Sequence, residues 1–184
     1  AVVGAGPAGL AYATVAAERG HKVTLYDAAN EIGGQFNMAK KIPGKEEFYE
    51  TLRYFNKRIE LTGVELKLGA FVEGAQLIDE GYDEVIVATG VVPRNPDIEG
   101  QDHAKVLSYI EVLRDEKPVG DKVAIIGAGG IGFDVAEYLS QDGQSPSLSI
   151  EDFMHEWGVD MKNEHRGGLS EPEMPKPKRE ITML

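Results

Sequence analysis

Three glycines near the start of the chain have the spacing of a phosphate-binding turn. Gly4, Gly6 and Gly9 form a GxGxxG pattern, and Asp27 follows 23 positions after Gly4. In this pattern the first glycine permits a tight turn, the second lets the backbone approach a pyrophosphate, and the third lets a helix pack closely on a strand. A carboxylate at this distance accepts hydrogen bonds from a ribose. Together these residues predict a dinucleotide site.

The elements that must position this turn can be read on either side of it. A strand over residues 1–3 enters the turn, a helix over residues 10–17 leaves it, and a strand over residues 22–26 leads to Asp27. Pro7 and Ala8 lie within the turn itself. The free N–H groups and the dipole of the helix start both favour phosphate. A chance glycine turn in an α/β protein is the competing interpretation, and this setting argues against it.

Two further stretches can supply polar contacts. Gly34, in the pair Gly33-Gly34, permits a second close backbone approach, and Gln35 can offer its amide to a ribose or pyrophosphate. A plain surface turn is the alternative. Lys45 opens a helix predicted over residues 45–62, where a cation opposes the helix dipole. This misfit suggests a phosphate or ribose contact, although an ordinary surface lysine fits equally well.

Later strands are expected to complete the site. We predict strands over residues 64–68 and 71–73, the second of which could offer the backbone of Val72 to an adenine. A buried strand is predicted over residues 84–90. It ends in small residues that leave room for a ligand at the switch point of a parallel sheet, namely Ala88, Thr89 and Gly90. Ser108 and Glu111 have the spacing of a capping box that opens a short helix through Arg114.

The opening pattern then returns. A strand over residues 122–126 leads into Gly127, Gly129 and Gly132, and a helix follows over residues 133–140. Residues 141–180 form a long insertion with a docked helix that Ser149 caps and Gly158 ends, before a strand over residues 181–184. We therefore predict an α/β protein with two Rossmann-like three-layer dinucleotide-binding units, the second interrupted and truncated. Two dinucleotides held face to face are what a flavin enzyme fed by a nicotinamide needs.

Composition narrows the functional classes. The 184 residues carry a formal net charge of −12, which argues against nucleic acid and anionic membranes as partners. The absence of cysteine excludes disulfides, thiol catalysis and cysteine-held clusters within these residues. The four histidines show no ligand spacing, so we predict no metal site, and no apolar run is long enough to span a membrane. We expect a cytoplasmic location and, from the short strands at both ends, a piece of a longer polypeptide.

Four stretches carry a family resemblance over essentially the whole chain. The sequence resembles the bacterial NADPH-dependent 2,4-dienoyl-CoA reductases, in a wider group with trimethylamine dehydrogenase and other NADH:flavin oxidoreductases. The stretches are EIGGQFN at 31–37, IPGKEEFYETLR at 42–53, AIIGAGGIGFD at 124–134 and EWGVD at 156–160. The resemblance implies an FAD-binding domain over residues 1–117 and the first part of an NAD(P)H-binding domain over residues 118–184, with the insertion at about 141–180.

The resemblance also implies a reaction and a set of contacts. Hydride would pass from NADPH to FAD, and electrons would then reach FMN through an iron–sulfur cluster to reduce 2,4-dienoyl-CoA in unsaturated fatty acid breakdown. The barrel, the cluster, the substrate pocket and a C-terminal FAD segment would lie in the remainder of the polypeptide, so the resemblance implies no catalytic residue within these residues. The implied FAD contacts are Gly4, Gly6, Ala8, Gly9, Asp27, Gln35, Lys45 and Val72. The implied NADPH contacts are Gly127, Gly129, Gly130, Ile131 and Gly132.

Two alternatives stay open. In trimethylamine dehydrogenase-like relatives a similar domain holds ADP as a structural module without flavin chemistry. A reductase of the same group that acts on another substrate has the same features in this region.

Overall fold

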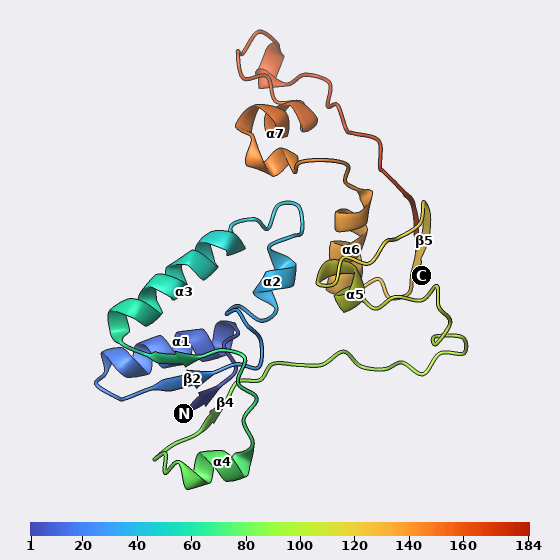
Figure 1. The fold of residues 1–184 in the computed structure, drawn as a ribbon. Coiled ribbons are helices and arrows are strands. Elements are labelled where there is room, and N and C mark those ends of the chain that lie inside the picture. Colours follow the sequence, from blue (N-terminus) through green and yellow to red (C-terminus); the bar gives the residue numbers. More distant parts are fainter. The chain divides into compact units, whose positions relative to one another are not determined.

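The computed structural model describes residues 1–184, which form two units. The first unit comprises Ala1–Ala39 and Glu47–Gln101, and the second comprises Lys40–Glu46 and Asp102–Leu184. Figure 1 labels their helices and some of their strands. Each unit is described separately below.

The first unit is built on a four-stranded parallel sheet in the order β3-β2-β1-β4. The register pairs Val2 with both Leu25 and Ile86, and Leu25 with Leu66. Its strands are β1 (Val2–Val3), β2 (Thr24–Tyr26), β3 (Glu65–Lys67) and β4 (Ile86–Val87). Its helices are α1 (Pro7–Glu18), α2 (Phe36–Ala39), α3 (Phe48–Thr62) and α4 (Gly74–Asp79).

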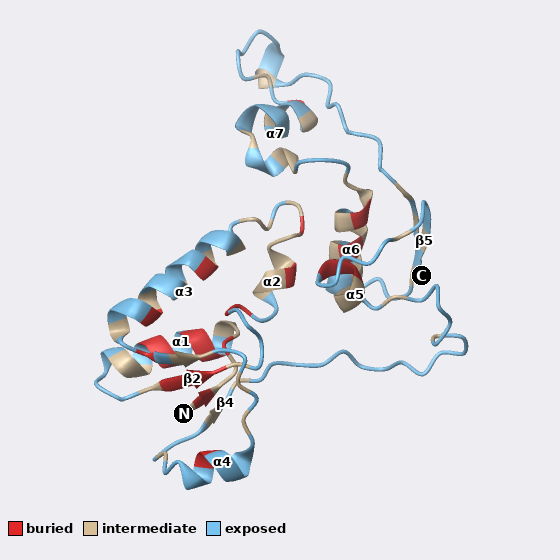
Figure 2. Ribbon diagram, in the orientation of Figure 1, coloured by how far each residue is buried: buried red, intermediate tan, exposed pale blue.

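The core of this unit lies where α1 and α3 meet the sheet. The central strands and α1 are the most buried part of the unit, as Figure 2 shows. Helix α3 buries Leu52 and Ile59 on its apolar face and ends at Gly63. This glycine is left-handed, with a φ of 73°, and its N–H donates to the carbonyl of Ile59 at 3.1 Å. Buried side chains on one face and a left-handed glycine at the C-cap are typical of a helix that packs on one side and ends at that glycine.

The second unit has a two-stranded parallel sheet, in which β5 pairs with β6 and Val123 lies opposite Ile181. Ser108 and Glu111 form the predicted capping box of α5. Ser149 caps α7 through the N–H of Asp152, also as predicted. The elements are α5 (Tyr109–Leu113), β5 (Lys122–Ile125), α6 (Gly130–Ser140), α7 (Ile150–Glu156), β6 (Glu180–Met183) and 3-10 turns at Pro146–Leu148 and Arg166–Gly168.

Three structural predictions were wrong. Residues 71–73 form no strand. The backbone bonding of this segment to the neighbouring chain ends at Ala70, whose N–H donates to the carbonyl of Asp27, just beyond the end of β2. The strand predicted over residues 84–90 is reduced to Ile86–Val87, and Val87 is 75% exposed because β4 pairs on one side only. Helix α7 forms as expected, but its apolar side chains do not dock on the rest of the unit. Ile150 and Trp157, at its two ends, are 68% and 59% exposed.

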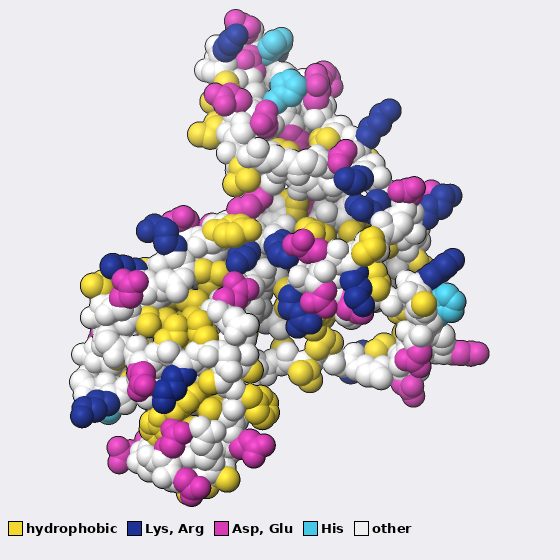
Figure 3. Space-filling model, viewed as in Figure 1, with side chains coloured by type: hydrophobic (Ala, Val, Ile, Leu, Met, Phe, Trp, Pro, Cys, Tyr) yellow, Lys and Arg dark blue, Asp and Glu magenta, His cyan; other side chains and the backbone are white.

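The α/β class with parallel strands and glycine turns is confirmed. No helix combines the length and the apolar character that crossing a bilayer requires. Figure 3 shows acidic side chains over much of the visible face with Lys and Arg among them, in keeping with the net charge of −12.

Candidate dinucleotide site

The first glycine turn is tightly enclosed by backbone. Gly4 has a φ of +107°, and a Cβ built on it would lie 2.3 Å from the carbonyl oxygen of Ala88. A Cβ on Gly9 would lie 1.8 Å from the carbonyl oxygen of Gly4. Any side chain at either position would therefore force the turn away from β4 or from α1.

The start of α1 fits a pyrophosphate. Gly6 is its N-cap in an extended conformation, Pro7 follows, and no side chain caps the helix or places an acid in its first turn. The N–H groups of a first helical turn have no acceptor within the helix. A Cβ on Gly6 would meet only the Cα of Gly34, at 4.0 Å, so the space beside Gly6 is open. Ala8 lies in this first turn and is exposed.

The paired glycines lie directly against this turn. The N–H of Gly33 donates to the carbonyl of Ala5 at 2.8 Å. A Cβ on Gly34 would lie 3.0 Å from the Cα of Gly6, so the two backbones approach more closely than side chains allow. Gln35 follows with an exposed side chain. The structure thus brings the second predicted stretch to the first.

The carboxylate of Asp27 is also held at the turn. One oxygen accepts the N–H of Ala5 at 2.6 Å, and the other accepts the N–H of Ala29 at 2.8 Å. Both bonds fix the orientation of the side chain at the end of β2, the position from which a ribose is expected to be recognised.

The end of β4 reaches the same turn. The N–H of Ala88 donates to the carbonyl of Val3 at 2.8 Å, while the Ala88 carbonyl lies over Gly4. Thr89 and Gly90 continue from it and are exposed. Val72 is half-buried in an irregular segment rather than in a strand. Its contact with adenine stays a prediction.

Lys45 does not lie in a first helical turn as predicted, because α3 begins only at Phe48. It also has a partner that the sequence did not indicate. Its ammonium bonds both carboxylate oxygens of Asp134 on α6, at 2.6 and 2.7 Å. Nearby in sequence, Lys41 bonds the carbonyl of Leu113 at 2.7 Å and the carboxylate of Glu116 at 2.6 Å. Residues 40–46 thus belong to the second unit through these bonds, and the role of Lys45 toward FAD stays a prediction.

The second glycine turn repeats the geometry of the first. Gly129 is the extended N-cap of α6, again with no side-chain cap and no acid in the first turn. A Cβ on Gly132 would lie 1.9 Å from the carbonyl oxygen of Gly127. By contrast, a Cβ on Gly127, Gly129 or Gly130 would meet nothing within 4 Å. Ile131 is 53% exposed, so this helix start is accessible.

A polar cluster around Tyr26 was missed. The Tyr26 hydroxyl bonds Glu80 and Tyr82, each at 2.7 Å, and accepts from Lys67 at 3.3 Å. Burial, followed by the Tyr82 and Glu80 bonds, raises the pKa of Tyr26. Glu80 and Tyr82 lie more than fifty positions from Tyr26, and no local pattern links them. The cluster joins α4 and the segment after it to β2.

Comparison with known proteins places this geometry in a family. The family model described as pyridine nucleotide-disulphide oxidoreductase matches residues 1–160. Cinnamate reductase of Clostridium sporogenes is 38% identical over an alignment of 152 residues that covers 80% of this chain. Bilirubin reductase of Mediterraneibacter gnavus is 35% identical over 147 residues, also 80% of this chain. The chain spans only 22% and 23% of the lengths of these two relatives, respectively.

A solved structure of a reductase has a similar fold over most of this chain. The complex of 2-naphthoyl-CoA reductase with 2-naphthoyl-CoA superposes with a TM-score of 0.72 at 37% identity. The match covers 76% of this chain and 21% of that one.

Proposed function

Because the chain belongs to the pyridine nucleotide-disulphide oxidoreductase family, we propose that it is the FAD- and NADPH-binding part of a larger flavin-dependent reductase acting on 2,4-dienoyl-CoA. The family carries the coarser conclusion, a flavin-dependent NAD(P)H oxidoreductase domain with FAD and NADPH as cofactors. The assignment of FAD to the first unit and NADPH to the second is part of the proposal.

One observation carries the proposal. The chain contains two glycine turns in which an extended glycine N-cap opens a helix without a capping side chain or an early acid. Each helix start can therefore accept a diphosphate. The chemistry that the two cofactors supply when bound is hydride transfer from NADPH to FAD.

In this proposal the residues of this chain bind the two dinucleotides and orient them. The amides at the start of α1 would hold the FAD pyrophosphate, with Gly34 close behind the turn and Asp27 toward the ribose. The amides at the start of α6, with Gly130 and Ile131, would hold the NADPH pyrophosphate. Both turns stand at the carboxyl end of a parallel strand, where ligands bind in open α/β sheets.

Two observations support a CoA thioester as the substrate, one from the sequence and one from a structural relative. The four stretches at 31–37, 42–53, 124–134 and 156–160 resemble the dienoyl-CoA reductases. A structural relative at 37% identity is a reductase in complex with a CoA thioester. The curated relatives are reductases of cinnamate and bilirubin, so the substrate is the part of the proposal that most needs a test.

The test has two stages. The chain is first titrated with FAD and, separately, with ADP by calorimetry, and the visible flavin spectrum is recorded. We expect ADP to bind and FAD to gain little over it, because the flavin ring depends on residues outside this chain. In the complete protein we expect tight FAD binding and NADPH oxidation that depends on 2,4-hexadienoyl-CoA. A complete protein that binds ADP but not FAD would be an ADP-binding structural module, and the proposal would fail.

Substrate assignment is decided in the same assay. Cinnamate and bilirubin serve as matched alternatives to 2,4-hexadienoyl-CoA. Faster NADPH oxidation with either of them would overturn the dienoyl-CoA assignment and leave the flavin reductase assignment intact.

A further inference from the structure

A short part of the second unit comes from the middle of the sequence of the first. The strap (residues 40–46) belongs to the second unit, although Ala39 before it and Glu47 after it belong to the first. In sequence the strap joins the end of α2 to the start of α3. The chain therefore passes between the units at three places, namely at both ends of the strap and after Gln101.

The connection that leads to Gln101 offers little restraint. Residues 89–100 form no helix or strand, and each of them is exposed. Val92, for example, is 89% exposed. A connecting segment without buried contacts imposes little order on the parts that it joins. Of the three connections, the strap is thus the one whose contacts can restrain the second unit.

The two ends of the strap are held close together in the first unit. Phe36 of α2 and Phe48 of α3 stack, with their ring centroids 4.4 Å apart and an angle of 20° between the ring planes. Such an aromatic pair stabilises beyond the area that it buries. The helices that precede and follow the strap are therefore fixed to one another at its base.

The strap itself is stiff. The N–H of Lys45 donates to the carbonyl of Ile42 at 3.0 Å, which closes a tight turn over Pro43 and Gly44. Gly44 has a φ of +81°. Proline followed by a left-handed glycine is the sequence that a type II turn requires, and it leaves the chain little conformational freedom.

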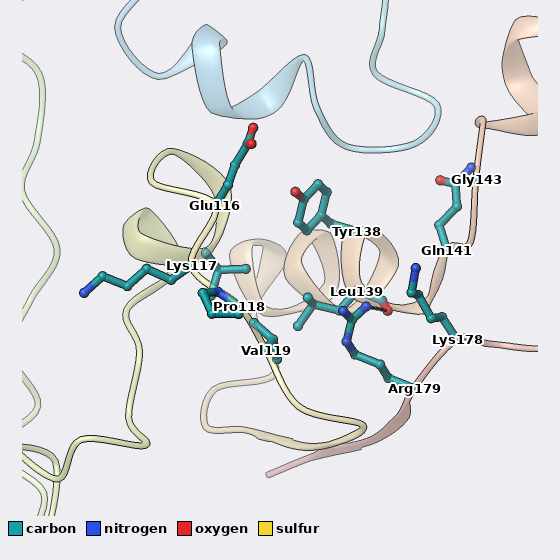
Figure 4. A pocket seen from close by; sticks show the side chains of 11 residues that line it. Glu116, Lys117, Pro118, Val119, Tyr138, Leu139, Gln141, Gly143, Lys178 and Arg179 are labelled. Atoms are coloured by element: carbon teal, nitrogen blue, oxygen red, sulfur yellow. Dashed lines mark hydrogen bonds between the residues drawn. The ribbon is translucent and has the colours of Figure 1, made fainter.

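Lys41 anchors the strap at the end of α5. Its ammonium donates to the carbonyl of Leu113 at 2.7 Å and to the carboxylate of Glu116 at 2.6 Å. Figure 4 shows the Glu116 carboxylate pointing away from the side chain of Lys117. Lys117 bonds Glu111 instead, so the neighbouring lysine does not compete with Lys41 for Glu116.

Three further contacts hold the rest of the strap. The Lys45 ammonium bonds both carboxylate oxygens of Asp134 on α6, at 2.6 and 2.7 Å. The hydroxyl of Ser147 donates to the carboxylate of Glu46 at 2.8 Å. Ile42 is only 2% exposed. Ion pairs between partly exposed side chains stabilise little singly, so these anchors act together with the buried Ile42.

We propose that the strap positions the second unit for hydride transfer, with Lys41, Ile42 and Lys45 as its positioning residues. The inference rests on the proposed function, in which hydride passes between cofactors that the two units bind. Hydride transfer needs the two reacting atoms in contact, and a small misplacement slows it strongly. A unit joined only through residues 89–100 would take many orientations, whereas the anchored strap limits them.

Spin labels test the restraint without any cofactor. The chain has no cysteine, so labels go cleanly on Leu61→Cys in α3 and Glu137→Cys in α6, both exposed positions. Double electron–electron resonance then gives the distribution of distances between the labels in the 184-residue chain. We expect one narrow distribution. The released variant, which combines Lys41→Met, Ile42→Ala and Asp134→Asn, should broaden it by about twofold or more.

Two variants serve as controls for the released variant. Lys178→Met breaks a pair of the same kind within the second unit, between Lys178 and Asp142 at 2.7 Å, and should leave the distribution narrow. Lys41→Arg keeps the cation and its donors and should do the same. Circular dichroism confirms that each variant folds. A released variant as narrow as the unaltered chain, or equal broadening by Lys178→Met, would overturn the proposal.

Stopped-flow mixing of the complete protein with saturating NADPH tests the consequence for hydride transfer. In the released variant the rate constant of flavin reduction should fall by about tenfold or more, while the Kd of NADPH and the FAD content change by less than about threefold. Lys41→Arg should retain the rate. An unchanged rate in the released variant, or an equal loss of NADPH affinity, would overturn the role of the strap. No flavin reduction in the unaltered protein would instead overturn the proposed function.

Discussion

The two glycine turns share the close contact between their first and third glycines and differ in what covers the first glycine. In both, the third glycine lies so close to the first that a Cβ would fall within 2 Å of a carbonyl oxygen, 1.8 Å at Gly9 and 1.9 Å at Gly132. In the first turn Gly4 is also covered by Ala88 from β4, whereas nothing lies within 4 Å of a Cβ on Gly127. The close contact between helix and turn is thus common to both turns. The first turn is covered in addition by the end of a further strand, β4.

The sheets explain this difference. Strand β1 has a neighbour on each side, β2 and β4, while β5 has only β6. Figure 2 shows the consequence in burial, with β1 and β2 deep in the first unit and β5 largely exposed. A turn at the end of a central strand is enclosed by its neighbours, and a turn at the end of an edge strand stays open.

The largest loss of folding stability is expected from substitutions at the third glycine, whose contact is the same in both turns. Gly9→Ala and Gly132→Ala should each destabilise their own unit by about 3 kcal/mol or more, because the new Cβ overlaps a backbone oxygen. Gly74→Ala is the control, since its Cβ meets nothing within 4 Å and the site is the start of α4. Urea unfolding measures the loss of stability in each variant, and amide hydrogen exchange shows in which of the two units the loss occurs. A mild effect at either position would mean that the helix and strand do not approach so closely.

A sharper comparison uses the first glycine of each turn. Gly127→Ala should cost only the backbone strain of its positive φ, about 1–3 kcal/mol. Gly4→Ala has similar strain and also meets the Ala88 carbonyl at 2.3 Å, so its cost should be larger by about 1–3 kcal/mol. Equal destabilisation of the two variants in urea unfolding would show that β4 does not cover the first turn.

These contacts also show how far the sequence alone could reach. The turns, α1, α3, the α5 capping box and the Ser149 cap follow from residues a few positions apart, and all were predicted. The short helix α4 was missed because six residues carry no clear period. The Lys45–Asp134 pair and the Tyr26 cluster join residues far apart in sequence, so only the tertiary structure reveals them.

Burial was the least predictable property. The apolar run around Val87 has the composition of a buried strand, yet burial depends on neighbouring elements that composition does not specify. The same holds for α7, whose apolar residues have helical spacing but remain exposed. The roles of the site residues in binding stay predictions, since the structure gives their positions and not their ligands.

The smallest predicted effect concerns pH and the second unit. Bonds from Lys117, then from the N–H and hydroxyl of Ser108, lower the pKa of Glu111 to about 2 from its ordinary value of 4.5. A lowered pKa means that the folded state holds the charged form more strongly. The stability that Glu111 contributes is therefore full above pH 4.5 and is lost as the pH falls to about 2.

Glu111→Gln should flatten this part of the stability profile. Urea unfolding at several pH values between 2 and 5 measures the slope in both proteins. Other carboxylates with a lowered pKa remain in the variant and account for a residual slope, among them Asp160, Asp142 and Glu116. An unchanged slope in Glu111→Gln would contradict the lowered pKa of Glu111 in the folded protein.

The most direct test of the account is a reciprocal loss of cofactor binding. Gly6→Val and Gly129→Val place a side chain beside each helix start, and circular dichroism checks that both variants fold. A Cβ on Gly6 would meet only the Cα of Gly34, at 4.0 Å, and a Cβ on Gly129 would meet nothing within 4 Å. We predict that Gly6→Val weakens FAD binding to the complete protein at least 100-fold and changes NADPH binding less than threefold, and that Gly129→Val does the opposite. Loss of both cofactors in one variant, or of neither in both, would contradict the assignment of one dinucleotide to each turn.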